Sequence, residues 1–365
     1  MVSSKLSVEI EKYLKKLYGV PLRIKYLGPI SKQESSFGGL KEFGYGKTLL
    51  IEFEVKGEEK SLVLSSMTKN IFGHEHFSDR AQSLLLAHSC FNNLPRHAKS
   101  VDVGVYTKSG EMLSVGDAEE FFIVTEKVDG ELYFLDLERI KSSGKLIEQD
   151  IERAEVLASY LAEIHKVKNA EQSLYTRRIR ELIGHGECLM GLTDSYPEKL
   201  DFTDADELRD IEKKCIDYRY KIKSKTSRLC QVHGDFHPWN ILFRSGVDFT
   251  VIDRSRGEWG EAADDVASIT VNYLFYSLQS SGRIEGPFLK LFNIFWDTYL
   301  EKTGDYEILS VVAPFYAWRG LVVASPIWYP KLHCELRRKI FSFIHNVLSK
   351  DVLNLTDVPA MFEVV

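Results

Sequence analysis

The first third of the chain shows the two-residue alternation of apolar and polar positions that is typical of β-strands. Runs rich in apolar and β-favouring residues predict strands at 21–28, 47–55 and 60–67. A glycine and several charged residues separate the last two runs, which indicates a hairpin. We therefore expect an antiparallel sheet near the N-terminus.

Two further segments belong to this strand-rich region. At 77–94 apolar residues, Ala81, Leu84 and Leu85 among them, recur at helical spacing, so one helix is expected to interrupt the strands. The segments 102–107 and 120–128 are expected to form another antiparallel pair across a turn and a longer loop.

From about residue 130 the pattern becomes helical. The clearest helix is predicted at 146–168, whose apolar residues recur at a spacing of three and four. A second, buried helix is expected to begin near residue 264. The sequence therefore predicts an α+β fold in two lobes, with a small strand-rich lobe at 1–126 and a larger, mostly helical lobe at 127–365.

Composition and charge narrow the class of protein. The 365 residues are 44% hydrophobic and 27% charged, which is typical of an ordinary globular protein and excludes wholesale disorder. The formal net charge of −6 gives no reason to expect nucleic acid or a membrane as a partner. The five cysteines form no CxxC pair, and no stretch has the roughly 18–20 apolar residues of a membrane span. We therefore expect a cytoplasmic protein with reduced thiols; the sequence leaves its oligomeric state open.

The stretch QVHGDFHPWNILF, residues 231–243, concentrates two histidines, an aspartate and an asparagine. Two kinds of chemistry use such a cluster. A metal-dependent hydrolase would use His233, Asp235 and His237 as ligands of a zinc ion. The two histidines reach one ion only if the local backbone is suitable, and this interpretation leaves Asn240 without a role.

A phosphotransferase would use the same stretch differently. Phosphoryl transfer needs a carboxylate that accepts the hydroxyl proton, and oxygen ligands that hold magnesium at the nucleotide phosphates. Asp235 and Asn240 have the H-x-D-x-x-x-x-N spacing of protein kinases, and a predicted hairpin after them brings Asp253 beside Asn240. The sequence therefore favours phosphoryl transfer over metal-dependent hydrolysis.

The stretch VHGDFHPWNILF, followed by VIDRSRGEWGEAADDVAS, resembles the aminoglycoside phosphotransferase and choline kinase-like family. The helix LASYLAEIH, which ends at His165, is similar to a helix of the same family. The resemblance implies a two-lobed, protein-kinase-like fold, with Asp235 as catalytic base and Mg²⁺ bound by Asn240 and Asp253. It also implies ATP or GTP as co-substrate and a small hydroxyl-bearing molecule as acceptor.

Other residues of the motif are expected to have structural roles. His233 would stabilise the catalytic loop through hydrogen bonds, and Trp239 would pack in the core. Asp264 or Asp265 would cap the helix that follows.

The N-terminal lobe departs from the family's pattern. The third strand normally supplies a lysine for the nucleotide phosphates, and Ser65 and Ser66 stand at that place. Lys60 and Lys69 lie at the two ends of the strand, and neither is well placed to replace it.

Nucleotide contacts are expected from two other segments. A glycine-rich loop offers Gly44 and Gly46, whose bare backbones can approach phosphates closely, and Lys47 could supply part of the missing charge. The segment that links the lobes would bind the nucleotide base through its backbone near Glu126 and Val128.

The acceptor is expected to meet the helical insertion before the catalytic loop. Arg178, His185 and Glu187 are candidate acceptor-binding residues, and a solvated helix face is the alternative. Arg254 and Arg256, which follow Asp253, would contact phosphate or an anionic substrate, or form surface salt bridges.

Taken together, these features predict a small-molecule kinase that moves the γ-phosphate of ATP or GTP to a hydroxyl group of an acceptor that the sequence does not identify. The absence of the strand lysine favours one rival hypothesis, a nucleotide-binding pseudokinase that acts as a regulatory module.

Overall fold

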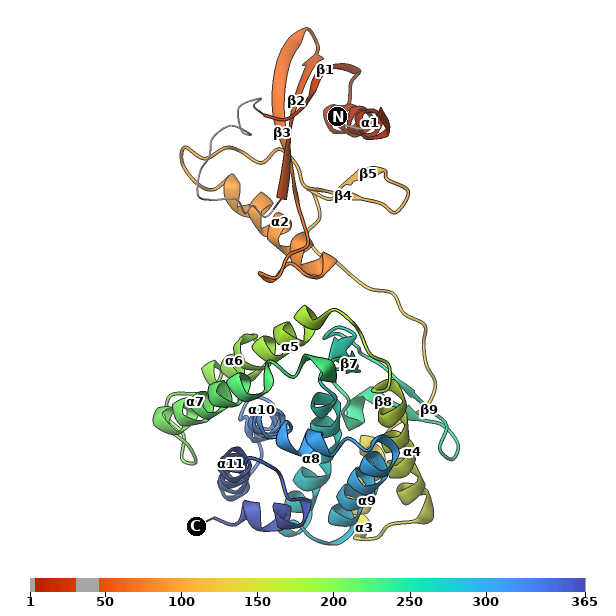
Figure 1. The fold of residues 1–365 in the computed structure, drawn as a ribbon, viewed down its shortest axis with the longest axis vertical. Coiled ribbons are helices and arrows are strands. Elements are labelled where there is room, and N and C mark those ends of the chain that lie inside the picture. Colours follow the sequence, from red (N-terminus) through yellow and green to blue (C-terminus); the bar gives the residue numbers. More distant parts are fainter. Residues whose placement is uncertain (1–3, 31–45, 365) are drawn as a thin grey trace. The chain divides into compact units, whose positions relative to one another are not determined.

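A computed structural model describes residues 4–30 and 46–364 of the chain. It divides into two compact units, Met1–Thr125 and Glu126–Val365, which we call unit 1 and unit 2. The first contains a small antiparallel sheet and the second is mostly helical (Figure 1). The predicted α+β fold class is therefore confirmed, whereas the roles predicted for the two lobes stay predictions.

Unit 1 is built around a three-stranded antiparallel sheet of order β1-β2-β3. Its described elements are α1 (Ser4–Tyr18), β1 (Leu22–Gly28), β2 (Gly46–Val55), β3 (Glu58–Met67), α2 (Phe77–Phe91), β4 (Gly104–Tyr106) and β5 (Met112–Ser114). The three long strands and α2 lie where the alternation and the helical spacing predicted them. Ile10 and Leu14 of α1 share a small core with Ile51 and Phe53 of β2, because successive strand residues point to opposite faces and only one face is covered.

One predicted strand of unit 1 is wrong. The segment 120–128 forms neither helix nor strand, and β4 pairs with β5 instead. The side chains of Phe122, Ile123 and Val124 are more than 80% exposed. The apolar pattern alone predicted a strand here, but a strand also needs a partner with free backbone groups.

Unit 2 consists of nine α-helices and short strands in its described residues. The elements before the catalytic motif are β6 (Glu131–Leu132), α3 (Phe134–Ser143), α4 (Glu148–Ile164), α5 (Gln172–Gly184), α6 (Leu189–Asp194), α7 (Ala205–Ile222) and β7 (Cys230–Gln231). Those from the motif onward are the 3₁₀ helix η2 (Pro238–Asn240), β8 (Ile241–Phe243), β9 (Phe249–Val251), β10 (Trp259–Gly260), α8 (Ala262–Ser281), α9 (Gly286–Thr303), α10 (Ala313–Ala324) and α11 (Cys334–Leu348).

Helix α8 is the centre of unit 2. Every residue from Ala262 to Leu278 is buried, and α3, α4, α9 and α10 pack around the helix. A helix that is apolar on all sides is stable only when other elements cover it completely. Asp264 and Asp265 in its first turn are also buried, and Asp265 binds the backbone of His233 and Gly234.

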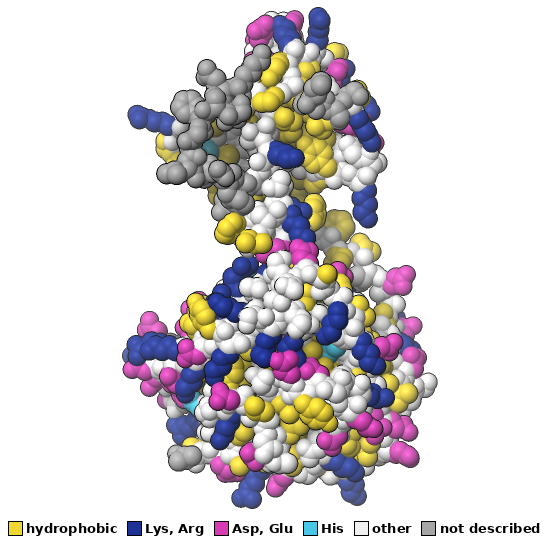
Figure 2. Space-filling model, in the orientation of Figure 1, with side chains coloured by type: hydrophobic (Ala, Val, Ile, Leu, Met, Phe, Trp, Pro, Cys, Tyr) yellow, Lys and Arg dark blue, Asp and Glu magenta, His cyan; other side chains and the backbone are white. Residues whose placement is uncertain are grey.

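The outer surface of unit 2 is mixed in charge. Figure 2 shows Lys and Arg side chains interspersed with Asp and Glu on the face that it draws. Among the described helices, none is both long and apolar enough to cross a membrane.

Candidate active site

The loop that the sequence predicts to be catalytic, called the catalytic loop below, runs from His233 to Asn240 between two pairs of strands. Before it, Val232 donates its N–H to Glu258 O at 3.0 Å, next to the pairing of β7 with β10. Gly234 has φ +87°, a conformation that costs other residues steric energy, and a Cβ there would lie 3.2 Å from Cβ of Arg256. The glycine of the motif is therefore required by the backbone of the loop.

Asp265 of α8 holds the start of the loop. Its carboxylate accepts the N–H groups of His233 and Gly234, both at 2.7 Å, and lies 3.2 Å from Nε2 of His165. Burial alone would raise the pKa of Asp265, but the contacts with His165 and His233 outweigh it and lower the pKa. The carboxylate therefore stays ionised and fixes the loop to α8.

The predicted capping role of Asp264 or Asp265 is wrong. Glu261 is the N-cap of α8 and accepts the N–H of Ala263 at 3.3 Å. Asp264 instead binds two arginines, Arg178 and Arg319. An aspartate can either cap a helix or form an ion pair. Which of the two it does depends on partners far along the chain, which the local sequence does not show.

His233 binds the backbone of the loop with both ring nitrogens. Nε2 lies 3.0 Å from Ile252 O, and Nδ1 lies 3.3 Å from the N–H of Asp235. These contacts agree with the expected structural role and leave no ring nitrogen for a zinc ion. Among the described residues, no group of three or more His, Cys, Asp or Glu side chains lies close enough together to hold a metal ion.

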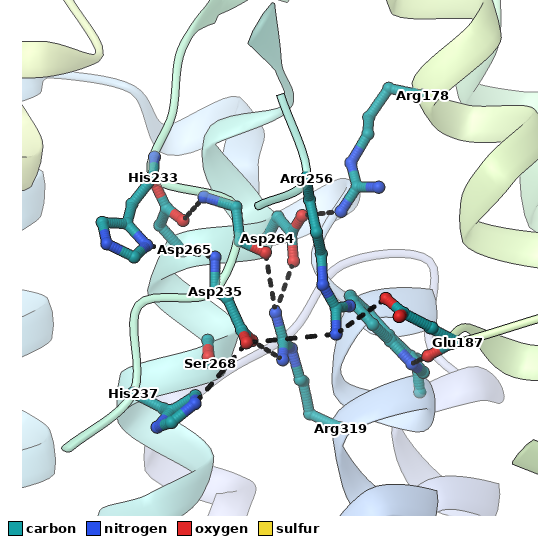
Figure 3. A network of polar contacts seen from close by, with 12 residues as sticks. Arg178, Glu187, His233, Asp235, His237, Arg256, Asp264, Asp265, Ser268 and Arg319 are labelled. Carbon is teal, nitrogen blue, oxygen red and sulfur yellow. Dashed lines mark hydrogen bonds and ion pairs between the residues drawn. The ribbon is translucent and has the colours of Figure 1, made fainter. Parts of the chain in front are cut away.

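Asp235 carries the carboxylate at the centre of the site (Figure 3). Arg319 of α10 donates from Nη1 to its Oδ1 at 2.7 Å. Nε2 of His237 lies 3.5 Å from Oδ2, and Nη2 of Arg256 lies 3.9 Å from the same oxygen. Burial alone would raise the pKa of this carboxyl, but His237, Arg319 and Arg256 outweigh it and hold the pKa well below its usual range.

Asn240 and Asp253 are brought together by the β8–β9 hairpin. Ile241 pairs with Val251, and the N–H of Ile252 donates to Asn240 O at 3.0 Å. Asn240 donates its amide N–H to Asp235 O at 3.0 Å. Asp253 has φ +59°, a left-handed conformation that is uncommon outside glycine and is concentrated at functional sites.

These two side chains suit a hard divalent cation. Neither Oδ1 of Asn240 nor the exposed carboxylate of Asp253 forms a hydrogen bond or ion pair within the described chain. Magnesium prefers such oxygen ligands and completes its octahedron with water and phosphate oxygens. The donor set thus fits the metal that the sequence predicted, although the ligand roles stay predictions.

The predicted acceptor residues lie in different surroundings. Arg178 of α5 is buried and paired with Asp264, so it is neither a solvated helix residue nor a free ligand. His185 and Glu187 are exposed in the connection between α5 and α6. Only Glu187 reaches the site, with its carboxylate 3.6 Å from Nη2 of Arg256.

Most of the predicted nucleotide-binding residues lie in unit 1. Gly44 is outside the described residues, and Lys47 is exposed at the start of β2. A Cβ at Gly46 would collide with the carbonyl oxygen of Ser66 on β3, so this glycine has a structural reason independent of any phosphate. Ser66 lies opposite Lys47 in the strand register, and no lysine occupies the middle of β3.

The other predicted nucleotide-binding residues, Glu126 and Val128, begin unit 2. They lie in a segment without regular structure, in which Glu126 is exposed and Val128 half-buried. Their backbone contacts with a nucleotide stay predictions.

Sequence reasoning missed the importance of Arg319. In the structure it donates to Asp235 and also, at 3.0 Å, to Asp264. An arginine inside an apolar helix was the available signal, because such a charge is buried only with partners.

Comparison with known proteins adds one family match. Residues 112–286 match the model of the phosphotransferase enzyme family. None of the curated proteins matches the chain in sequence.

Similarities to solved structures are weaker. An amicoumacin kinase in complex with AMP-PNP and Ca²⁺ is 14% identical, with 86% of this chain and 89% of that chain covered and a TM-score of 0.42. The choline kinase from Streptococcus pneumoniae is 11% identical, with 95% and 99% covered and a TM-score of 0.34. A glucosamine kinase in complex with glucosamine, ADP and phosphate is 16% identical, with a TM-score of 0.33; 61% of this chain is covered but only 58% of that kinase, less than two thirds of its length.

TM-scores of this size do not support a functional assignment. The proposed function is based on the family match and on the geometry of the site. The matched segment contains the whole catalytic loop, Asp253 and the buried start of α8. The resemblance inferred from the motif is confirmed by this match to the phosphotransferase enzyme family over residues 112–286.

Proposed function

We propose that the protein is a magnesium-dependent kinase that transfers the γ-phosphate of ATP or GTP to a hydroxyl group of a small acceptor. One observation carries this proposal. The ionised carboxylate of Asp235 lies near the start of a fixed loop, and the free oxygens of Asn240 and Asp253 lie at the end of that loop and just after the β8–β9 hairpin. Phosphoryl transfer needs little else from the protein beyond positioning and charge.

Asp235 would act on the acceptor. Its carboxylate accepts a hydrogen bond from the hydroxyl group, which orients the oxygen toward the γ-phosphorus. As the new P–O bond forms and the bond to the β-phosphate breaks, the hydroxyl proton passes to Asp235 and the nucleoside diphosphate leaves.

Asn240 and Asp253 would hold the metal. Bound there, Mg²⁺ would neutralise the charge of the β- and γ-phosphates. Asp253 lies just after β9 and has a left-handed backbone. The hydrogen bond from Asn240 to Asp235 O ties the metal side of the site to the base.

Arg319 has a positioning role in this proposal. It fixes one oxygen of Asp235 and lowers the pKa, which makes the aspartate a weak base and a strong orienting acceptor. A weak base can still accept the proton, because the acceptor hydroxyl becomes acidic once its oxygen has begun to bond to the γ-phosphorus. His237, near the other carboxylate oxygen, contributes to the same effect.

A pseudokinase is the second candidate, because β3 carries Ser65 and Ser66 in place of a lysine. Such a protein would bind a nucleotide without consuming it. The two functions differ in turnover and not in binding, so one experiment distinguishes them.

The test measures nucleotide consumption across a panel of hydroxyl-bearing metabolites. The purified protein is incubated with Mg²⁺ and ATP or GTP, and mass spectrometry detects the phosphorylated acceptor. Asp235→Asn should lower turnover by about 10²–10⁴-fold and leave nucleotide affinity nearly unchanged, since only the proton acceptor is removed. Asp351→Asn, an exposed aspartate paired with Lys221, is the matched control.

Two outcomes would overturn the kinase. Equal turnover by the wild type and Asp235→Asn would show that this carboxylate does not take part in the reaction. Nucleotide binding with no turnover of any panel member would favour the pseudokinase.

A further inference from the structure

Three arginines converge beside the catalytic aspartate from different elements of unit 2. Arg178 comes from α5, Arg256 from the turn after β9, and Arg319 from α10 (Figure 3). Their guanidinium carbons lie 5.9, 4.9 and 3.9 Å from the ring centre of Trp318, in that order. We call these three residues the arginine cluster.

Two members of the arginine cluster have strong partners. Arg178 is paired with Asp264, and Arg319 binds both Asp264 and Asp235. These contacts attach α5 and α10 to the first turn of α8. Both arginines are therefore part of the framework of the site.

Arg256 is different, because it forms no hydrogen bond with any residue that the structure describes. Its Nε and Nη1 are buried without a partner; Nε of Arg178 and Nε of Arg319 are also buried without one, but those two side chains donate from their other nitrogens. The nearest carboxylates, of Glu187 and Asp235, lie 3.6 and 3.9 Å from Nη2, which is beyond hydrogen-bonding distance. A guanidinium group has five donors, and buried donors are almost always satisfied by the protein, by water or by a ligand.

The charges near the arginine cluster do not balance. Three guanidinium groups face the carboxylates of Asp235 and Asp264, both largely buried. Glu187 is 65% exposed and touches the cluster only at its edge. One cationic group inside the site therefore lacks a buried anion, and a ligand with an acidic group would supply it.

The position of Arg256 indicates which substrate carries that group. Asn240 and Asp253, the proposed metal ligands, belong to η2 and the end of the β8–β9 hairpin. Arg256 lies instead against Glu187 of the α5–α6 connection and against Trp318 of α10. An anion bound to Arg256 would thus lie next to Asp235, between the α5–α6 connection and α10.

We propose that the acceptor is itself an acid, a hydroxy carboxylate or a phosphate ester, and that Arg256 binds its anionic oxygens while Asp235 receives its hydroxyl. The inference rests on the proposed kinase function and names the substrate class of that site. Glu187 competes with the ligand for Arg256 and turns toward solvent when the acid binds.

Calorimetry on the whole protein tests the inference with matched probes. Glycerate and glycerol phosphate are compared with glycerol, and gluconate with glucose; ethanolamine and choline represent cationic hydroxyl compounds. Each is titrated with Mg²⁺, in the presence and absence of AMP-PNP. The wild type should bind at least one acid about tenfold or more tightly than its neutral counterpart, because a charge-assisted contact typically gives this factor.

Two variants test whether the arginine cluster causes the preference for an acid over its neutral counterpart. Arg256→Gln should abolish it, while Glu187→Gln should strengthen acid binding severalfold by removing the competing carboxylate. Arg209→Gln on α7, an exposed arginine paired with Asp206, should leave it unchanged. Opposite effects at Arg256 and Glu187 would not arise from a purely structural role, and equal melting temperatures show that the variants fold.

The inference is wrong if no panel acid binds, if neutral or cationic compounds bind as tightly, or if Arg256→Gln keeps the preference. It is also wrong if Arg256→Gln raises the KM for ATP instead of the KM for the acceptor, since the nucleotide would then be the anion. Turnover with cationic or neutral compounds alone would overturn the acidic acceptor and leave the kinase intact. If the wild type binds acids but Asp235→Asn does not change turnover, the acid-binding role of Arg256 stands and the proposed role of Asp235 in the kinase reaction is overturned.

Discussion

Unit 2 buries some of its ion pairs, whereas the ion pairs between the strands of unit 1 lie at the surface. In unit 1, the ion pairs that join its strands are at the surface: Lys25 contacts Glu54 and Glu59, and all three side chains are exposed. In unit 2, Arg178 and Asp264 are both almost completely buried, as is the pair of Arg319 with Asp264. The buried pairs lie next to the catalytic loop.

This difference shows what the buried charges contribute. Surface ion pairs add little to stability, because water screens them and long side chains lose entropy. A buried ion pair stabilises the fold little more than apolar residues of similar size would. Removing one partner is nevertheless strongly destabilising, because it leaves the other charge buried and uncompensated. We infer that the buried pairs of unit 2 fix the position of Asp235 more than they stabilise the fold.

The largest expected effect follows from breaking a buried pair. Asp264→Asn would leave Arg178 and Arg319 without their shared carboxylate, so the free energy of unfolding should fall by about 3–5 kcal/mol. Denaturant unfolding measures this change. Turnover should fall as well, because Arg319 is no longer fixed beside Asp235.

Unit 1 supplies the matched control for that variant. Glu54→Gln also removes one carboxylate from an ion pair, but at the surface, and should leave unfolding unchanged within error. Equal losses in the two variants would contradict the contrast between the units.

A smaller effect is expected at the predicted phosphate contact of unit 1. Lys47→Gln should raise the KM for the nucleotide about tenfold, since one charge-assisted contact of about 1.5–3 kcal/mol is lost, and should leave the KM for the acceptor unchanged. Steady-state kinetics at several salt concentrations test this.

Lys60→Gln is the control for Lys47→Gln, because it removes the same charge at the other end of the β2–β3 hairpin. Lys60 lies over the ring of Tyr18 at 5.3 Å, so no change in nucleotide affinity is expected. If Lys47→Gln has no more effect than Lys60→Gln, the glycine-rich loop does not replace the missing lysine.

The smallest effect concerns pH. Folding lowers the pKa of Asp235 below its ordinary value of about 3.9, so the stabilisation from its ionised form is complete above that value and is lost as the pH falls toward the lower pKa of the folded state. The difference in unfolding free energy between the wild type and Asp235→Asn should stay constant from about pH 8 to about pH 5 and shrink below about pH 4.

Denaturant unfolding of both proteins at each pH measures that difference. A wild-type advantage that grows as the pH falls from about 7 to about 5 would mean that the folded-state pKa of Asp235 is raised rather than lowered, because protonation would then stabilise the folded protein.

The same contrast explains how far the sequence could predict the structure. Strands β1, β2 and β3 and helix α4 follow from strong local periodicity, and their approximate positions were predicted. The segment 120–128 has a strand pattern too, but pairing depends on a partner that the pattern does not specify. The periodicity of apolar residues therefore predicted a helix or strand well where neighbouring elements cover one of its faces.

The site was predictable only as far as its motif extends. Asp235, Asn240 and Asp253 lie within one loop and hairpin, so local spacing and the family motif were enough to predict them as one group. Asp264 lies 86 residues from Arg178 and 55 from Arg319, and no local pattern links them. The buried ion pairs around the base were missed for this reason.

The ring of Trp318 has a practical consequence. It is fully buried and lies within 6 Å of all three guanidinium groups of the arginine cluster. Indole emission responds to nearby charge, so a shift of Arg256 toward a bound acid should change the fluorescence of this residue. The difference between the spectra of the wild type and Trp318→Phe separates its signal from the other tryptophans. The protein thus contains its own optical reporter for ligand entry beside Asp235.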